Sequence, residues 1–143
     1  MSQVFAPVVS SAPRRLLLAC VYAACAAGAM AAHAQGAMPP WQGSGAARYV
    51  CGGIGSDEST AMRAAMKSHP LSLLFSRPDG AYLANVQVSI RGDAGTLDLR
   101  ADGPVCIIDL PAGKYTVQAT SGGATKSEAV TLGSTPRTVD FRF

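Results

Sequence analysis

Two methionines and a histidine recur at helical spacing near the middle of the chain. Met62, Met66 and His69 stand at positions i, i+4 and i+7, which places them on one face of an α-helix. Thioether sulfur and imidazole nitrogen both bind Cu(I), so this face predicts a soft-metal site, to which Met38 adds a further thioether. The same stripe is also typical of a helix that packs its methionines against a sheet. The sequence leaves both interpretations open.

The four cysteines divide into two pairs. Cys20 and Cys25 lie in the apolar N-terminal stretch, and Cys51 and Cys106 lie in the remainder of the chain. An even pair in a small exported domain most simply forms a disulfide, so we expect a Cys51–Cys106 bond. Two separate buried thiols are the alternative.

The N-terminus has the pattern of a secretory signal peptide. Arg14 and Arg15 precede the apolar run LLLACVYAACAAGAM, and Ala32-His33-Ala34 follows it. We therefore predict a signal peptide over residues 1–34, a flexible leader rich in Gly, Pro and Ala over 35–47, and one domain over 48–143. An uncleaved anchor and lipidation of Cys25 are the alternatives. Export to the periplasm is favoured, with an extracellular location as the other possibility.

Charge excludes one class of partner. The chain carries 12 basic and 9 acidic residues, and the two basic residues Arg14 and Arg15 leave with the signal peptide. The remaining domain has a net charge near +1 and no run of Lys or Arg. We therefore expect no binding to nucleic acid, and no integral membrane protein once the signal is removed.

Groups for catalysis are sparse in the sequence. Once residues 1–34 are removed, His69 is the only histidine, so any Ser-His-Asp triad must be built on it. No serine lies in a G-x-S-x-G elbow, and Cys51 and Cys106 are too far apart for a C-x-x-C pair. We expect no enzymatic activity and no cofactor.

The segment GGIGSDE predicts a turn followed by a helix. Gly52 and Gly53 begin the turn, Ser56 is a candidate N-cap, and Asp57 and Glu58 suit the positive end of a helix over about 57–67. Two carboxylates would repel a phosphate, so we interpret the segment as a capped turn or a recognition surface. Trp41 is a second recognition candidate, unless its ring folds back over a hydrophobic edge.

Most of the remaining chain alternates between apolar and polar residues, as strands do. The pattern is clearest over residues 82–90 and 114–120, and Gly- or Pro-containing turns separate the runs. We expect the runs 105–110 and 114–120 to form a hairpin around Pro111-Ala112-Gly113, and Gly122-Gly123 to form a tight turn. The pattern predicts a mainly β fold, a seven-stranded antiparallel sandwich of immunoglobulin size with one short helix.

Two stretches resemble the transthyretin-like, carboxypeptidase-regulatory-like β-sandwich domains found in small exported bacterial proteins. They are YLANVQV at 82–88 and DLPAGKYTV at 109–117. The resemblance is carried by a Leu-Pro-x-Gly turn followed by Tyr-x-Val, here Leu110, Pro111, Gly113, Tyr115 and Val117. It implies a prealbumin-like sandwich and transfers no catalytic residue.

Two functions follow as expectations. The first is a non-catalytic binding, adaptor or structural module whose partner is another protein of the bacterial cell envelope. The second is a periplasmic copper-binding protein that uses the Met62, Met66 and His69 face. A carbohydrate-binding sandwich is a third possibility, with little aromatic surface to support it.

Overall fold

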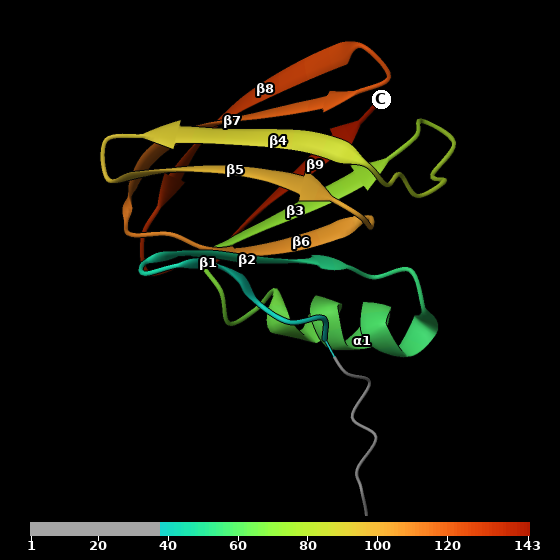
Figure 1. Cartoon of the computed structure of the whole chain (residues 1–143), viewed down its shortest axis with the longest axis horizontal. Coiled ribbons are helices and arrows are strands. Elements are labelled where there is room, and N and C mark those ends of the chain that lie inside the picture. The colour runs from blue at the N-terminus through green and yellow to red at the C-terminus, as the bar shows by residue number, and fades with distance from the viewer. Residues whose placement is uncertain (1–37) are drawn as a thin grey trace, which may run out of the picture. The chain divides into compact units, whose positions relative to one another are not determined.

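The computed structural model describes residues 38–143 (Figure 1). The predicted signal peptide, with Cys25, lies outside the described residues. The described part forms nine strands and one helix: β1 (Gln42–Ser44), β2 (Ala47–Gly52), α1 (Ser56–Ala65), β3 (Leu71–Ser76), β4 (Val86–Gly92), β5 (Gly95–Ala101), β6 (Val105–Asp109), β7 (Gly113–Ser121), β8 (Ala124–Leu132) and β9 (Arg137–Arg142). The expectation of a mainly β fold with one short helix is confirmed.

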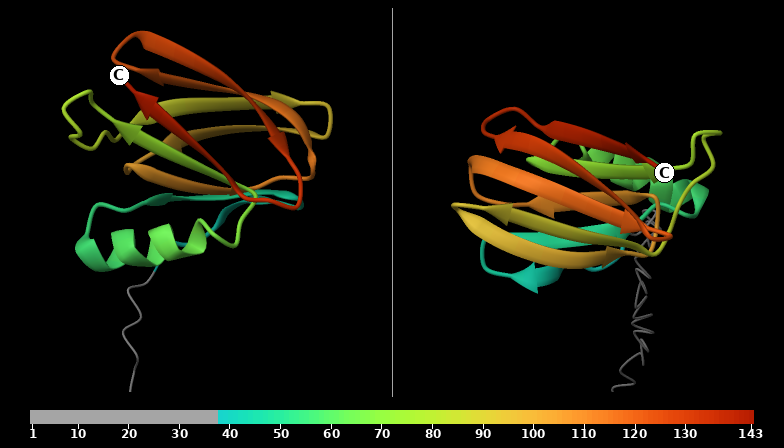
Figure 2. Two further views of the ribbon diagram at one scale, coloured as in Figure 1. Left: turned by 180° about the vertical axis from the view of Figure 1, so that it is seen from behind. Right: turned by 90° about the horizontal axis from the view of Figure 1, so that it is seen from above.

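The strands form two facing sheets. Sheet A has the order β1-β2-β6-β3-β9, and sheet B has the order β5-β4-β7-β8. Helix α1 covers the outer face of sheet A, so three layers are visible from both sides of the molecule (Figures 1 and 2). The arrangement differs from a seven-stranded antiparallel sandwich in two ways. It has nine strands, including the short strand β1, and β9 runs parallel to β3.

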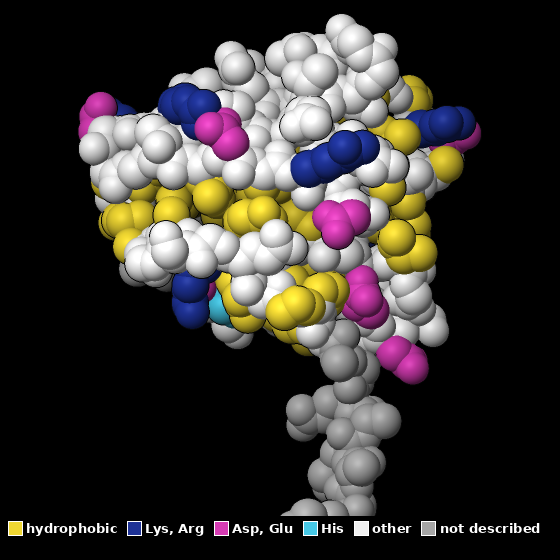
Figure 3. Space-filling model, in the orientation of Figure 1, with side chains coloured by type: hydrophobic (Ala, Val, Ile, Leu, Met, Phe, Trp, Pro, Cys, Tyr) yellow, Lys and Arg dark blue, Asp and Glu magenta, His cyan; other side chains and the backbone are white. Residues whose placement is uncertain are grey.

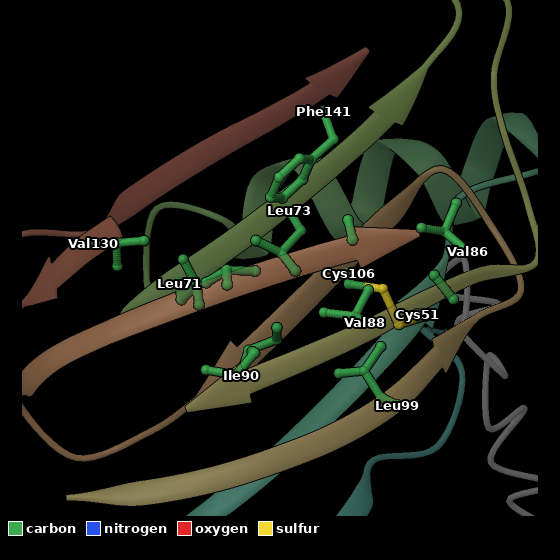
Figure 4. Packing of buried hydrophobic residues seen from close by; sticks show 14 of the residues in the cluster. Cys51, Leu71, Leu73, Val86, Val88, Ile90, Leu99, Cys106, Val130 and Phe141 are labelled. Carbon is green, nitrogen blue, oxygen red and sulfur yellow. A yellow bond between two sulfur atoms is a disulfide. The ribbon is translucent and has the colours of Figure 1, made fainter. Parts of the chain in front are cut away.

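The main core fills the space between the sheets. Every second residue of the central strands points inward, including Val86, Val88 and Ile90 from β4 and Val117 from β7, each at most 3% exposed. Figure 4 shows the side chains of β4 converging with Leu71, Leu73 and Phe141 from sheet A. Burial of this alternating set is the main contribution to stability that the sequence pattern encodes.

The predicted disulfide joins β2 to β6 and borders this core. Cys51 and Cys106 are directly opposite each other in the antiparallel ladder, with Cα atoms 4.1 Å apart. Both side chains point between the sheets, as Figure 4 shows, and both residues are at most 5% exposed. The bond therefore links neighbouring strands of sheet A and leaves the two sheets connected only by packing and loops.

A second hydrophobic cluster lies on the other face of sheet A, beneath α1. Met62 of the helix is fully buried there against side chains of β2 and β6. The buried members are Val50, Met62, Val105 and Ile107, and Met38, Trp41, Ala65, Met66 and Leu74 pack around them. The helix and the segment at residues 38–41 thus share the covering of one apolar patch.

The prediction of a hairpin around Pro111 is wrong. β6 belongs to sheet A and β7 to sheet B, so Pro111 and Ala112 carry the chain from one sheet to the other. The hydroxyl of Tyr115 donates a 2.7 Å hydrogen bond to the carbonyl oxygen of Pro111, which fixes this crossing. Such a tyrosine corner is typical of β-sandwiches. The Leu110–Val117 motif is thus a corner, with Leu110, Tyr115 and Val117 buried in the core.

Several expected boundaries also move. β4 begins at Val86, whereas we expected a strand from Tyr82, because Asn85 adopts a left-handed conformation with φ of 60° that interrupts the extended chain. Residues 42–44, expected to be a flexible leader, pair with β2. Helix α1 ends at Ala65, short of 67, and its N-cap is Gly55, with no capping by a side chain.

The turn at Gly122-Gly123 is confirmed. Both glycines have positive φ, 56° and 82°, and the flanking residues Ser121 and Ala124 are paired across the hairpin. This is the backbone that a two-residue turn of the I′ type requires.

Candidate functional site

One end of the sandwich gathers three loops. They are the β2–α1 loop (53–55), the β3–β4 loop (77–85) and the β5–β6 loop (102–104), all at the right-hand end in Figure 1. The pairing explains this, because Gly52 lies opposite Val105, and Leu74 is the partner of the same residue on its other side. We call these segments the loop end. Loops held at one end of a rigid sandwich are a common location for binding residues.

The base of the loop end is built from closely packed backbone. A Cβ atom on Gly103 would overlap the carbonyl oxygen of Gly52, so the β5–β6 loop lies directly on the end of β2. The next residue of that loop, Pro104, accepts a 2.9 Å hydrogen bond from the backbone N–H of Phe75. These contacts fix the loop to β2 and β3 together.

In the GGIGSDE segment, a side chain of the segment itself accepts the hydrogen bond of a backbone N–H in the turn. Oε1 of Glu58 accepts a 2.5 Å hydrogen bond from the N–H of Gly53, where φ is 90°. A carboxylate of this chain thus occupies the position that an anion would take at the turn. Of the predicted recognition residues, Gly52 and Gly53 are buried, Glu58 is partly buried and only Asp57 is exposed.

Two large apolar side chains project from the loop end. Ile54 is 73% exposed and Tyr82 is 61% exposed, and they are the exposed large hydrophobic residues of the described chain. Figure 3 shows hydrophobic side chains at this end, next to basic and acidic ones. Burying two such side chains in a complex would provide favourable hydrophobic free energy.

A groove of about 390 Å³ adjoins Tyr82. Leu74, Phe75, Pro78 and Pro104 supply its apolar lining, and the charged residues are Arg63, Asp79, Asp140 and Arg142. Nη2 of Arg63 donates a 3.2 Å hydrogen bond to the hydroxyl of Tyr82, while Arg142 pairs with Asp140 at 3.1 Å. The Arg63 guanidinium thus forms no ion pair with another described residue, so it is available to a carboxylate of a partner.

A second polar cluster is centred on Asp109, away from the loop end. The two carboxylate oxygens of Asp109 accept hydrogen bonds, one from Arg48 at 2.9 Å and one from Nδ1 of His69 at 2.7 Å. The ring of Trp41 lies beside both partners, 4.9 Å from the imidazole centroid and 5.3 Å from the Arg48 guanidinium carbon. In Figure 3 the imidazole, in cyan, is next to a basic side chain at the lower left. Trp41 thus folds back over the domain.

The three predicted metal ligands differ in their surroundings. Met62 is fully buried in the second cluster, Met66 is at the end of α1, and His69 lies beyond the helix with its Nδ1 on Asp109. Met62 and Met66 thus pack in the same cluster beneath α1, whereas His69 follows the helix and contacts Asp109. In residues 38–143, no three side chains of His, Cys, Asp or Glu are grouped to hold a metal ion.

The Asp109–His69 pair resembles two members of a catalytic triad. A triad also needs a nucleophile within hydrogen-bond reach of the other ring nitrogen. Among the described residues, the imidazole has a hydrogen bond only to Asp109, and no serine hydroxyl completes the arrangement. The arrangement fits a role in holding Trp41 in place.

Sequence reasoning missed the exposed large hydrophobic residues of the loop end. Tyr82 was expected to lie in a strand, and its only pairing among the described residues is a single bridge to Ser76. Ile54 received no role, although it was the one large apolar residue of a glycine-rich turn. That isolation was the available signal. Asp109 and Arg48 gave no signal, because they are distant in sequence and meet only through the β2–β6 register.

Comparison with known protein families and with curated proteins finds no match to this chain. In the described part of the chain, no helix is both long enough and apolar enough to cross a lipid bilayer.

Proposed function

We propose that this protein is a non-catalytic binding module of the bacterial cell envelope, located in the periplasm, that contacts another envelope protein through its loop end. The observation that carries the proposal is the exposure of Ile54 and Tyr82 on loops of the same end. The rigid base under these loops, made by Gly52, Gly103 and Pro104, lowers the conformational entropy that binding would cost.

The expected partner has an apolar side chain for the groove and a carboxylate for Arg63. Leu74, Phe75 and Pro78 offer an apolar lining, and Arg63 already donates to the neutral hydroxyl of Tyr82. An acidic group of the partner would form a charge-assisted hydrogen bond there, which is stronger than the bond to a phenol.

A photo-crosslinking amino acid placed at residue 54 or 82 of the exported protein tests this proposal. We expect the same adduct from both positions, and none from a probe at Ser134, an exposed residue in the β8–β9 loop at the other end. In the protein that carries the probe at residue 82, the further substitution Ile54→Ser should abolish the adduct and leave the melting temperature unchanged. An adduct that forms equally from position 134, or that survives Ile54→Ser, contradicts the proposal.

Soft-metal binding is the second candidate, favoured by one contact. Asp109 holds Nδ1 of His69 and leaves Nε2 as the nitrogen that can bind a metal, which is the usual arrangement around metal-bound histidines. Met38 and Met66 pack at the edge of the second cluster and are partly exposed, whereas Met62 is buried. Anaerobic Cu(I) titration against a competing chelator tests this reading. Equal affinity in a Met66→Leu, His69→Gln variant would remove it.

A further inference from the structure

β8 is an edge strand with two unmatched charges. It is the last strand of sheet B, and six consecutive residues, 124–129, are exposed on both faces (Figure 1). Lys126 and Glu128 lie on the face that continues into buried Val130 and Leu132. Neither forms an ion pair with another described residue, and Lys126 is only near the ring of Phe143, at 5.9 Å from its centroid.

The register of the hairpin shows which backbone groups of β8 are free. In a two-residue hairpin the flanking pair, here Ser121 and Ala124, exchanges both backbone hydrogen bonds, and hydrogen-bonded pairs then alternate along the ladder. The N–H and C=O groups of Thr125, Ser127 and Ala129 therefore point away from β7. The close contact between the hydroxyls of Thr120 and Thr125, at 2.8 Å, agrees with a non-hydrogen-bonded pair at that position.

The sequence of β8 is self-complementary about Ser127. In an antiparallel pair of two β8 strands related by a two-fold axis at Ser127, the free backbone groups of Thr125 face those of Ala129 in the second copy. Lys126 then lies opposite Glu128 of the second copy, twice, in the non-hydrogen-bonded positions where side chains are closest. A shift of register by two residues would lose this charge pairing.

We propose that β8 pairs with β8 of a second copy of this chain, which joins the two B sheets into one continuous sheet across the dimer. Charges that point toward the core side of an edge strand normally discourage strand pairing. Here they discourage every partner except one that presents the opposite charge order, so the same two residues both block unspecific pairing and select a second copy. The dimer leaves the loop end of each copy free and does not depend on the proposed binding function.

Charge reversal and charge exchange in the full exported protein test the dimer. In sedimentation equilibrium we expect the wild type to dimerise, and more weakly at high salt because the ion pairs are partly exposed. Lys126→Glu and Glu128→Lys each place like charges opposite each other twice, and we expect each to weaken dimerisation about tenfold or more. The double variant Lys126→Glu, Glu128→Lys restores opposite charges and should recover the dimer.

Arg100→Glu is the matched control, because Arg100 is an exposed residue on β5, the opposite edge strand of sheet B. It should leave the dimer unchanged. Circular dichroism of each variant verifies that the fold is retained. A wild type that is monomeric at millimolar concentration overturns the proposal. The proposal is also overturned if the single charge reversals do not weaken the dimer, or if the double variant does not restore it.

Discussion

The ring of Tyr115 lies so close to the backbone of Gly92 that a Cβ atom on this glycine would overlap ring carbon Cδ1. The two residues are partners in the β4–β7 ladder, and the Tyr115 hydroxyl continues to the carbonyl oxygen of Pro111. Gly92 thus provides the space in which the tyrosine corner forms. An aromatic ring over a glycine in the neighbouring strand also shields the exposed backbone of that glycine.

Tyr115→Phe should lower the free energy of unfolding by about 1 kcal/mol, because it removes one hydrogen bond and leaves the Pro111 carbonyl without this donor. Urea unfolding followed by circular dichroism measures the change. Tyr82→Phe is the control, since Tyr82 is exposed and its hydroxyl is hydrogen-bonded, within residues 38–143, to Arg63 alone. It should change stability by less than about 0.5 kcal/mol. Equal effects of the two variants would mean that the corner bond does not stabilise the fold.

Alkaline pH should destabilise the protein through the same residue. Burial raises the pKa of Tyr115 above its ordinary value of 10.0, so the folded state holds the phenolic proton more tightly than the unfolded state. The contribution to stability is complete below pH 10 and is lost as the pH rises through 10 toward the folded pKa. Unfolding midpoints measured between pH 8 and 11 should therefore fall less steeply for Tyr115→Phe than for the wild type.

Loss of the disulfide should be costly. Cys51 and Cys106 are 55 residues apart, and the chain-entropy model assigns a loop of this length about 4 kcal/mol. We expect the paired Cys51→Ser, Cys106→Ser variant to lose up to this amount in urea unfolding. The intact mass of the wild type should be about 2 mass units below that of the reduced chain, since closing the bond removes two hydrogens. A wild type that already carries two free thiols contradicts the assignment.

Gly103→Ala should destabilise the loop end. The added methyl group would overlap the Gly52 carbonyl, and overpacking of this kind costs about 1–3 kcal/mol. Gly133→Ala is a matched control, because a Cβ atom at Gly133 meets nothing within 4 Å. The difference between the melting temperatures of the two variants isolates the steric effect. If both variants have the same melting temperature, the close approach of the β5–β6 loop to Gly52 is not required for stability.

Asp109→Asn should release Trp41. Asp109 orients both Arg48 and His69, which lie beside the indole, and its neutral amide would bind them more weakly. Trp41 is the only tryptophan in the chain, so its fluorescence reports on this position alone. We expect emission to shift to longer wavelength as the ring becomes more exposed to water. Asp98→Asn, which alters the exposed ion pair with Arg91, should leave the emission unchanged.

The local sequence pattern predicted where strands and turns occur better than it predicted which strands pair with one another. The period-two run over Tyr115, Val117 and Ala119 identified an inward-facing strand, and Gly122-Gly123 identified its turn, because both depend on neighbouring residues alone. The Pro111 crossing was misread as a hairpin, since a turn composition does not tell which sheet receives the next strand. The parallel pairing of β3 with β9 depends on residues far apart in sequence and leaves no local signal.

The candidate site shows the same division. Glu58 was expected at the start of a helix and lies there. Its hydrogen bond to the N–H of Gly53 depends on the positive φ of that glycine, which the sequence allows but does not require. Tyr82 continued an alternating pattern that Asn85 interrupts, so its exposure could not be predicted from periodicity. The Asp109 cluster needed the register of β2 with β6, and that register is fixed by the packing of the whole sheet.

The position of the Cys51–Cys106 bond also determines how the domain would respond to mechanical force. A pull on the segment before β2 passes through the covalent bond into β6, so the residues between the two cysteines carry no tension. Helix α1, the two loops that hold Ile54 and Tyr82, and the β4–β5 hairpin all lie within this protected segment. Under load only β1, most of β2 and the chain after Cys106 can be drawn out, and the shielded segment keeps its length until the bond is reduced.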